Sequence, residues 1–419
     1  MAGRDATLGI DFGTSNSAAG HAPDGRPVLI ALEPGGVTMP TTVFFDAAER
    51  RLLTGAAANA ALLEGREGRF MRALKRVLGT ALLHEPRRIL WERVTLAQLI
   101  TRFLAELRER AEAQTGLTFR HAVSGRPVVF HATDDPREGQ ALEDLRACYL
   151  AAGFESVDFM AEPEAAALAA GAGRQPGMVS LIVDIGGGTS DFALIEARGD
   201  GPAILASHGL RLGGTDFDRT LSLDHVMPLL GRGGTLRRAM GPGLDPVPNA
   251  LYADLATWER IPFVTTPQNL RLAAEMARLA TQLAPMARLV ALLEEELGHD
   301  VAFAVEDGKI AANGRDDGAR VSLAMLERGL EAPLPPQALA ESLARHAGPL
   351  RDAALATLAR AGLDAARVDE VVYVGGSSLM AVVPETMRAL FPAARHLTHE
   401  VFTAVADGLA LAASGRGFS

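Results

Sequence analysis

Cysteine is almost absent from this sequence. Its 419 residues include a single cysteine, Cys148, so a framework of disulfide bonds is excluded. The apolar spacing of residues 145–152 predicts an amphipathic helix around this cysteine. That setting indicates a buried packing thiol rather than a nucleophile.

Long apolar runs are also missing. No window reaches the roughly 18 uninterrupted apolar residues that a membrane-spanning helix needs. Residues 1–10 lack the basic, apolar and small-residue zones of a secretory signal peptide. We therefore expect a soluble, cytoplasmic protein without a membrane partner.

Positive charge is in the minority. The chain has 41 Lys and Arg against 51 Asp and Glu, a net charge of −10, which disfavours a nucleic-acid-binding surface. It also lacks the Gly-x-x-x-x-Gly-Lys-Ser/Thr loop and the strand-linked Gly-x-Gly-x-x-Gly fingerprint. Nucleotide binding stays open, because backbone N–H groups and a metal ion can bind phosphates.

Strand-like and helix-like segments alternate along the chain, which predicts an α/β fold with a mainly parallel or mixed sheet. The apolar patterns predict strands at 7–11, 128–130 and 157–160, and helices at 96–113 and 136–152.

A short motif occurs twice. Asp11-Phe-Gly-Thr-Ser15 and Asp184-Ile-Gly-Gly-Gly-Thr-Ser190 each place an aspartate at the end of an apolar strand, followed by glycine and then Thr-Ser. The separation is that of a whole domain, so the repeat predicts a duplicated α/β domain with a cleft between its halves.

The chemistry of such turns suits phosphate. Glycine allows positive φ and a close approach of backbone N–H groups to a ligand, and successive N–H groups form anion-binding concavities. An aspartate at the strand end can hold a hydrated Mg²⁺ against the same phosphates. One such turn alone is more simply explained as a tight hairpin, but two copies in matching contexts favour binding.

These turns resemble the phosphate-1 and phosphate-2 motifs of the actin, hexokinase and heat-shock ATPase superfamily. The resemblance is greatest to the ATPase domain of the seventy-kilodalton, DnaK-type heat-shock chaperones. Four further segments occur in the family's order, namely residues 74–79, 161–167, 212–218 and 374–378. The resemblance spans residues 7–413.

The resemblance implies an α/β fold of duplicated actin-like (ribonuclease H-like) ATPase domains facing a central nucleotide cleft. The first half would cover residues 1–170, with an inserted subdomain at about 37–115. The second would cover residues 171–419, with an inserted subdomain at about 219–310.

The resemblance also implies the cofactors, ATP or ADP with Mg²⁺, and the roles of individual residues. Asp11 and Asp184 would orient Mg²⁺ through its waters. Lys75 would position the attacking water, and a network around it would comprise Glu162, Thr189 and Asp191. Phosphate contacts are expected from Gly13, Thr14, Ser15, Gly186, Gly187, Gly188, Thr189, Gly213 and Gly214. Adenosine contacts are expected from Gly375, Gly376, Ser377, Glu306 and Lys309.

Simpler explanations exist for some of these residues. Lys75 could be one more charge on a solvated basic face, and Glu162 could simply begin a helix, where a carboxylate complements the dipole. Glu306 and Lys309 could form a surface i,i+3 pair.

The sequence departs from the family pattern in places. Leu379 stands where the family has an arginine that stacks on adenine, and Ile310 replaces a basic residue, so we expect weaker nucleotide affinity. The chain resembles the shorter YegD-like branch of the family, so we expect no β-rich peptide-binding domain after the last helix.

We expect a chaperone-type module that binds ATP, hydrolyses it slowly and opens and closes its cleft with the nucleotide. Client proteins or co-chaperones are the expected partners. A small-molecule kinase of the same superfamily, or an actin-like filament or scaffold protein, is the alternative.

Overall fold

The computed structural model describes residues 5–131, 135–170, 175–198, 201–398 and 403–415. The chain forms two compact units. Unit 1 comprises residues 1–214 and 348–419, and unit 2 comprises residues 215–347. Each is described by itself. The domain boundary predicted at 170/171 lies beside residues 171–174, which are outside the described residues.

The first large sheet of unit 1 is built around the first Asp-Gly-Thr-Ser turn. Its strand order is β11-β10-β1-β2-β3, with β4 also pairing with β2. The β1–β2 pair is antiparallel, whereas β10 and β11 extend the sheet in parallel. The strands are β1 (Asp5–Phe12), β2 (Asn16–His21), β3 (Val28–Leu29), β4 (Thr38–Pro40), β10 (Thr118–Arg126) and β11 (Ser156–Ala161).

The second large sheet repeats this plan around the second turn. Its order is β14-β13-β12-β19-β20, with an antiparallel β12–β13 pair and β19 and β20 added in parallel. The strands are β12 (Val179–Ile185), β13 (Ser190–Arg198), β14 (Gly201–Leu210), β19 (Glu370–Val374) and β20 (Arg395–Thr398). Both sheets therefore place an antiparallel hairpin beside two parallel strands, so the predicted duplication of an α/β fold is confirmed.

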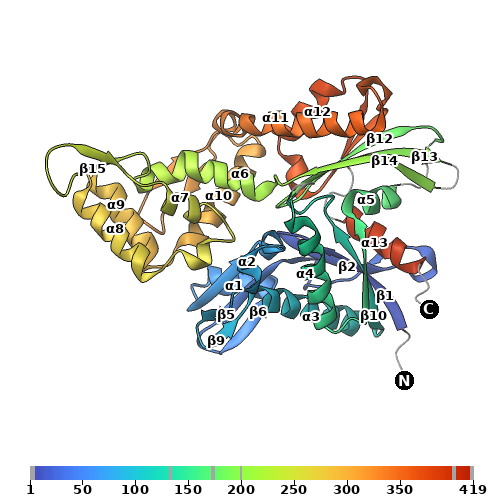
Figure 1. Ribbon diagram of the computed structural model, residues 1–419, viewed down its shortest axis with the longest axis horizontal. Helices are drawn as coiled ribbons and strands as arrows, with labels where there is room; N and C mark the ends of the chain where they lie inside the picture. The colour runs from blue at the N-terminus through green and yellow to red at the C-terminus, as the bar shows by residue number, and fades with distance from the viewer. Residues whose placement is uncertain (1–4, 132–134, 171–174, 199–200, 399–402, 416–419) are drawn as a thin grey trace. The chain divides into compact units, whose positions relative to one another are not determined.

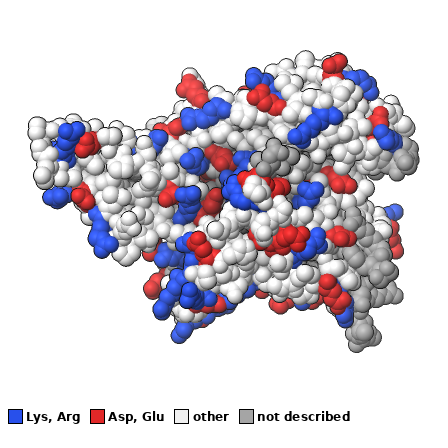
Figure 2. Space-filling model, viewed as in Figure 1, with Lys and Arg blue, Asp and Glu red and all other residues white. Residues whose placement is uncertain are grey.

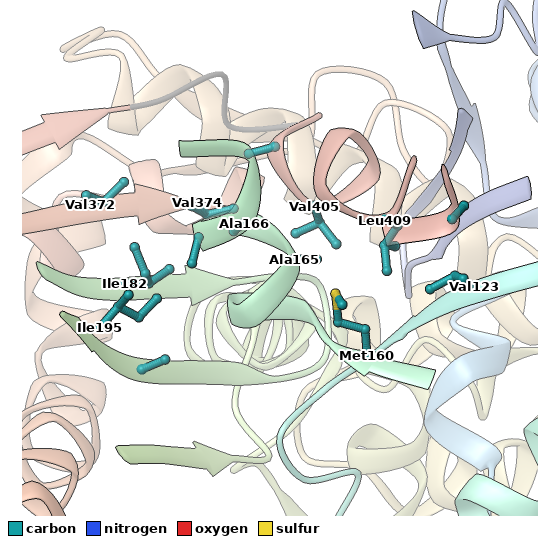
Figure 3. Packing of buried hydrophobic residues seen from close by; sticks show 14 residues of the cluster. Val123, Met160, Ala165, Ala166, Ile182, Ile195, Val372, Val374, Val405 and Leu409 are labelled. Carbon is teal, nitrogen blue, oxygen red and sulfur yellow. The ribbon is translucent and has the colours of Figure 1, made fainter. Parts of the chain in front are cut away.

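Two helices pack between the sheets of unit 1. In Figure 1, α5 (Glu162–Ala170) and α13 (Ala404–Ser414) lie side by side there. Figure 3 shows their small and branched side chains meeting apolar residues of both sheets, including Val123 of β10 and Ile182 of β12. All are nearly or fully buried, so this cluster forms one apolar core that joins the two sheets.

The predicted helices at 96–113 and 136–152 are confirmed as α3 (Leu96–Thr115) and α4 (Arg137–Ala151). Helix α3 begins with a capping box between Thr95 and Gln98. Cys148 of α4 is buried with its Sγ 3.6 Å from the Ala97 carbonyl oxygen. This burial agrees with the predicted packing role, and it raises the pKa of the thiol to about 11.

The strand predicted at 128–130 is wrong. Strand β10 ends at Arg126, and Pro127 follows, which has no N–H to continue a ladder. The backbone N–H groups of Val128 and Phe130 donate instead to side-chain carboxylates, those of Asp191 and Glu138. The segment is apolar enough for a strand, but its hydrogen bonds go to side chains.

Smaller elements complete unit 1. One three-stranded sheet has the order β6-β5-β7, and a two-stranded sheet pairs β8 with β9. The strands are β5 (Thr42–Asp46), β6 (Arg51–Thr54), β7 (Gly68–Arg72), β8 (Arg87–Ile89) and β9 (Glu92–Val94). The helical elements are η1 (Pro23–Gly25), α1 (Ala56–Leu63), η2 (Leu74–Val77), α2 (Ala81–His84), η6 (Ala365–Arg367), η7 (Gly376–Leu379) and α12 (Val382–Leu390).

Unit 2 is mainly helical. It contains most of α6 (Gly214–Leu221), which begins in unit 1, and the first part of α11 (Pro336–Ala361), which ends in unit 1. Between them come η3 (Ser222–Val226), η4 (Met227–Leu230), α7 (Ala250–Leu255), η5 (Ile261–Phe263), α8 (Pro267–Leu279), α9 (Leu283–Glu294) and α10 (Gly298–Asn313). Two hairpins pair β15 (Thr235–Arg237) with β16 (Leu244–Pro246), and β17 (Arg320–Ser322) with β18 (Glu331–Pro333).

Charged side chains of both signs are intermixed over the face that Figure 2 shows. None of the helices described combines the length with the apolar character that crossing a membrane requires.

Candidate functional site

The two Asp-Gly-Thr-Ser turns meet within unit 1. A Cβ added to Gly187 would collide with the Oγ of Ser15, and one added to Gly188 would lie 2.8 Å from the Oγ1 of Thr14. The second turn is tightened by a hydrogen bond from the Gly186 N–H to the Thr189 carbonyl, at 3.1 Å. The structure therefore brings together turns that are far apart in the sequence, with glycines at their closest approach.

A second pair of glycines lies against the same turn. A Cβ on Gly213 would come within 2.6 Å of the backbone of Gly187 and Gly188. The Gly214 N–H donates to the Gly186 carbonyl at 3.0 Å, and a Cβ on Gly214 would collide with the Oγ of Ser377. Only residues without a side chain allow these backbones to approach so closely.

The segment after β19 completes this group. Gly375 has φ +77°, a conformation that favours glycine, and a Cβ there would lie 2.5 Å from the Oδ1 of Asp184. Gly376 and Ser377 follow in η7. The predicted residues 186–189, 213–214 and 375–377 are thus neighbours around the end of β12.

Buried carboxylates lie at the ends of the hairpin strands. Asp184 and Asp191 face each other across β12 and β13, and both are almost fully buried. Asp11 occupies the corresponding position on β1. Burial, followed by the charge of Glu162, raises the pKa of Asp11 to about 7 although Lys75 opposes the rise. Burial, with the neighbouring carboxylates, raises the pKa of both Asp184 and Asp191 well above the usual range.

Lys75 is the cation among these carboxylates. Its side chain is 7% exposed, which rules out the alternative of a solvated basic face, and its Nζ lies 2.6 Å from the Oε1 of Glu162. Burial by itself would lower the pKa of Lys75, but the charges of Glu162 and Asp11 outweigh it and raise that pKa. Glu162 also begins α5, so it serves both as a helix-start carboxylate and as the partner of Lys75.

The network continues to Asp191. Its Oδ1 accepts a hydrogen bond from the Val128 N–H at 2.7 Å. A hydrogen bond from the Thr189 side chain also lowers its pKa, against the larger effect of burial. The structure therefore brings Lys75, Glu162, Thr189 and Asp191 into one electrostatically linked group.

Comparisons with known proteins identify the family of the chain. Residues 7–232, more than half of the chain, match the family described as "Hsp70 protein". The chain belongs to the Hsp70 family. Chaperone protein DnaK of Endomicrobium trichonymphae is 35% identical over 228 residues, which cover 52% of this chain and 34% of DnaK. The chain thus matches about a third of the length of that relative.

The Hsp70 resemblance also predicted adenosine contacts from Glu306 and Lys309, which the structure places on α10 in unit 2. Lys309 is 8% exposed on its side chain, and its Nζ lies 2.6 Å from the Oδ1 of Asp218. The Oδ2 of Asp218 accepts from the Nε1 of Trp258 at 3.1 Å. Glu306 is partly exposed on the same helix. Lys309 is therefore engaged in a buried ion pair within unit 2, and its adenosine role stays a prediction.

The donor set of the Hsp70 site suits a divalent cation. Four carboxylates, those of Asp11, Glu162, Asp184 and Asp191, interact with one another and with a single lysine, and ionising them together is costly. Carboxylate oxygens are the ligands that Mg²⁺ prefers, and the glycine backbones nearby leave room for phosphate. Within the described ranges, no three His, Cys, Asp or Glu side chains are grouped to hold a metal ion directly.

Three residues of this region escaped the sequence analysis, namely Val128, His131 and Asp144. The Val128 N–H bonds the Asp191 side chain, and the side chains of His131 and Asp144 bond backbone groups of the loop after Lys75. A backbone contact leaves little trace in residue type. The only available signal was the break in strand pattern at Pro127.

Proposed function

We propose that this Hsp70-family chain binds ATP with Mg²⁺ on the two facing turns of unit 1 and hydrolyses it slowly. The observation that carries the proposal is the group of four carboxylates around Lys75, of which Asp184 and Asp191 are buried and Asp11 and Glu162 partly buried, beside the glycine-lined turns. Such a group is costly in a protein without a cationic ligand, because burial penalises every negative charge. A magnesium–nucleotide complex would supply the missing positive charge, and its phosphates would lie against the two glycine-lined turns.

Each part of the chain has a defined task in this proposal. The backbone N–H groups of residues 13–15 and 186–189 would bind phosphate oxygens, and Asp11 and Asp184 would hold the hydrated Mg²⁺. Lys75 is oriented by Glu162 toward the terminal phosphoryl group, where its charge stabilises the transition state and positions the attacking water. Mg²⁺, when bound, would neutralise part of the charge of the phosphates. Catalysis is therefore positioning and electrostatics.

We further propose that the nucleotide drives opening and closing of the cleft in a chaperone-type cycle in the cytoplasm. A ligand shifts such an equilibrium only by its differential affinity for the two states, and ATP bridging both turns would provide that difference. DnaK is named a chaperone protein. Client proteins or co-chaperones are accordingly the proposed partners.

Replacing Lys75 tests the proposal. The Lys75→Ala variant should bind MgATP with an affinity within a few-fold of the wild type, but its single-turnover hydrolysis should fall about 100-fold or more, because one aimed positive charge is lost. Calorimetric titration and quenched single-turnover assays measure the two quantities.

Arg102→Ala is the matched control, since it removes a cation from a different ion pair of unit 1, the one with Glu92. It should leave both quantities unchanged. Unchanged hydrolysis in Lys75→Ala would contradict the role of Lys75, and a wild-type protein that does not bind MgATP would overturn the function itself.

A further inference from the structure

The peptide bond between Leu78 and Gly79 is held at both of its polar groups by side chains. The Nε2 of His131 donates to the Leu78 carbonyl oxygen at 2.8 Å. The Oδ2 of Asp144 accepts from the Gly79 N–H at 2.9 Å. Because both hydrogen bonds are short and act on opposite edges of one peptide, together they fix its orientation. We name this arrangement the Leu78–Gly79 clamp.

The backbone at the clamp lies directly against α4. Gly79 has φ +73°, and a Cβ there would come within 2.6 Å of the Arg137 carbonyl and 3.1 Å of the Ala141 Cβ. Only glycine fits this position without strain. The loop is therefore pressed onto the first turns of α4, which also carries Asp144.

His131 is itself held firmly. The backbone N–H of His131 donates to the Oε2 of Glu138 at 3.0 Å. The backbone N–H of Phe130 donates to both oxygens of the same carboxylate at 2.9 Å. The His131 side chain is almost fully buried. The backbone of His131 is thus fixed, and its imidazole is directed at the Leu78 carbonyl oxygen.

The clamp is continuous with the element that carries Lys75. Leu78 follows η2 directly, and its N–H donates back to the Lys75 carbonyl at 3.4 Å. His131 belongs to the segment 128–131, and at the other end of that segment the Val128 N–H donates to the Oδ1 of Asp191. Residues 128–131 therefore join the Lys75 loop to the second turn through backbone and side-chain hydrogen bonds.

The surroundings of His131 favour the neutral tautomer whose Nε2 carries a proton and can always donate a hydrogen bond to Leu78. Its Nε2 must carry the proton that Leu78 accepts, whereas its Nδ1 is buried and has no hydrogen-bond partner among the described residues. Burial lowers the pKa of His131, the bond to Leu78 opposes this, and the neighbouring Arg211 and Arg137 lower it further while Asp135 raises it. The carboxylate of Glu138 binds the His131 backbone, and that of Asp144 lies across the peptide. At neutral pH the ring is therefore neutral, with its proton on Nε2.

We propose that His131, together with Asp144, is a positioning residue for Lys75. By fixing the Leu78–Gly79 peptide, the two side chains hold η2 so that the Lys75 ammonium reaches Glu162 and the phosphate site. The inference rests on the proposed function for its catalytic consequence, but the clamp itself concerns the nucleotide-free protein. A small displacement of a charge aimed at a transition state lowers the rate strongly while leaving ground-state binding nearly intact.

The test compares three variants of the 419-residue chain. His131→Leu removes the donor, and His131→Gln keeps an amide donor. His396→Leu is the matched control, because His396 also lies in unit 1 and its Nε2 bonds a backbone carbonyl, that of Phe391, at 3.1 Å. Two readouts are used. The first is hydrogen–deuterium exchange of the nucleotide-free protein, followed in the proteolytic fragment that covers residues 74–83. The second is single-turnover hydrolysis, measured together with the affinity for MgATP.

In His131→Leu, exchange at the Gly79 amide should accelerate about tenfold because its peptide is no longer held. Hydrolysis should slow about tenfold, with the ATP dissociation constant within twofold of the wild type. His131→Gln should recover most of both losses, and His396→Leu should match the wild type in both.

Equal effects of His131→Leu and His396→Leu, or no recovery by His131→Gln, would overturn the proposal, as would a rate loss explained by weaker ATP binding. If His131→Leu does not fold, Asp144→Ala removes the opposite hydrogen bond, and the same split between rate and affinity is required of it. A wild-type protein that does not hydrolyse ATP overturns the proposed function. The exchange measurement needs no nucleotide and still decides whether His131 holds the peptide.

Discussion

At the scale of single residues, the site is defined by charges that burial makes costly. Asp11, Asp184 and Asp191 all have a raised pKa, with burial as the largest cause. Lys75 offsets this repulsion only in part, although Glu162 holds it in place at 2.6 Å. Local stability is thus lowered in the ligand-free state at the site where we propose that cations and phosphate bind, a cost that is common at functional sites.

This cost predicts a pH dependence of stability. The carboxyl of Asp11 has a pKa of about 7 in the folded protein and about 3.9 when unfolded. The folded state therefore binds this proton more tightly than the unfolded state does. The favourable contribution of Asp11 to the free energy of unfolding is fully present below about pH 4 and is lost as the pH rises to 7. Without Mg²⁺ and nucleotide, Asp11→Asn should be more stable than the wild type at pH 8, by on the order of 2 kcal/mol.

Urea unfolding in the presence of a chelator, at pH 5 and pH 8, measures this difference. The advantage of Asp11→Asn should shrink at pH 5, and a larger advantage at the lower pH would contradict the assignment. The variant should also gain less stability than the wild type from added MgATP, because it lacks a carboxylate for the cation.

At the scale of elements, α13 is the piece that brings the two sheets of unit 1 into one body. A Cβ on Gly9 of β1 would lie 2.5 Å from the Ala410 N, and a Cβ on Gly408 of α13 would collide with the backbone of Ala165 in α5. Glycines at both contacts let helix and strand backbones touch.

The Gly408→Ala variant should therefore be strongly destabilised, by about 3 kcal/mol or more, because a methyl group would be forced into backbone atoms of α5. Gly139→Ala in α4 is the matched control, since nothing lies within 4 Å of the added Cβ. It should stabilise the protein by up to about 1 kcal/mol through helix propensity. Urea denaturation gives both values, and similar free energies of unfolding for the two variants would refute the backbone contact.

At the scale of the whole molecule, the chain is divided into two compact units. Unit 2 has its own buried anchor, in which Asp218 of α6 binds both Lys309 of α10 and Trp258. An ion pair this deeply buried is sensitive to the loss of one partner, because the remaining charge loses its counterion in a medium of low dielectric constant.

Lys309→Met should accordingly destabilise unit 2 by about 3–5 kcal/mol, whereas Lys309→Met combined with Asp218→Asn should recover much of this loss because no unpaired charge remains. Hydrogen–deuterium exchange of the full chain can locate the effect. Protection should fall in α7 and α10 and persist in β1 and β12, since the two units have separate cores. An equal loss in the strands of unit 1 would show that the molecule unfolds as one cooperative body.

Much of the fold and of the candidate phosphate site follows from local sequence. The strands that end at Asp11 and Asp184, the glycine turns after them and helices α3 and α4 were all predicted. Each is specified by apolar period or by turn chemistry within a few residues. The resemblance to heat-shock ATPases then pointed to Lys75 and Glu162, which lie 87 residues apart in the chain.

Only the tertiary structure decided which long-range contacts these residues make. Nothing near Val128 or His131 in the sequence reveals that their partners are Asp191 and the Leu78 carbonyl. Lys309, predicted beside adenosine, is paired with Asp218, which is 91 residues away. The sequence by itself determined the local elements and the repeated turn, because period and glycine act over short distances. The tertiary structure decided the burial, the pKa shifts and the clamp, because these depend on atoms that meet only when the chain has folded.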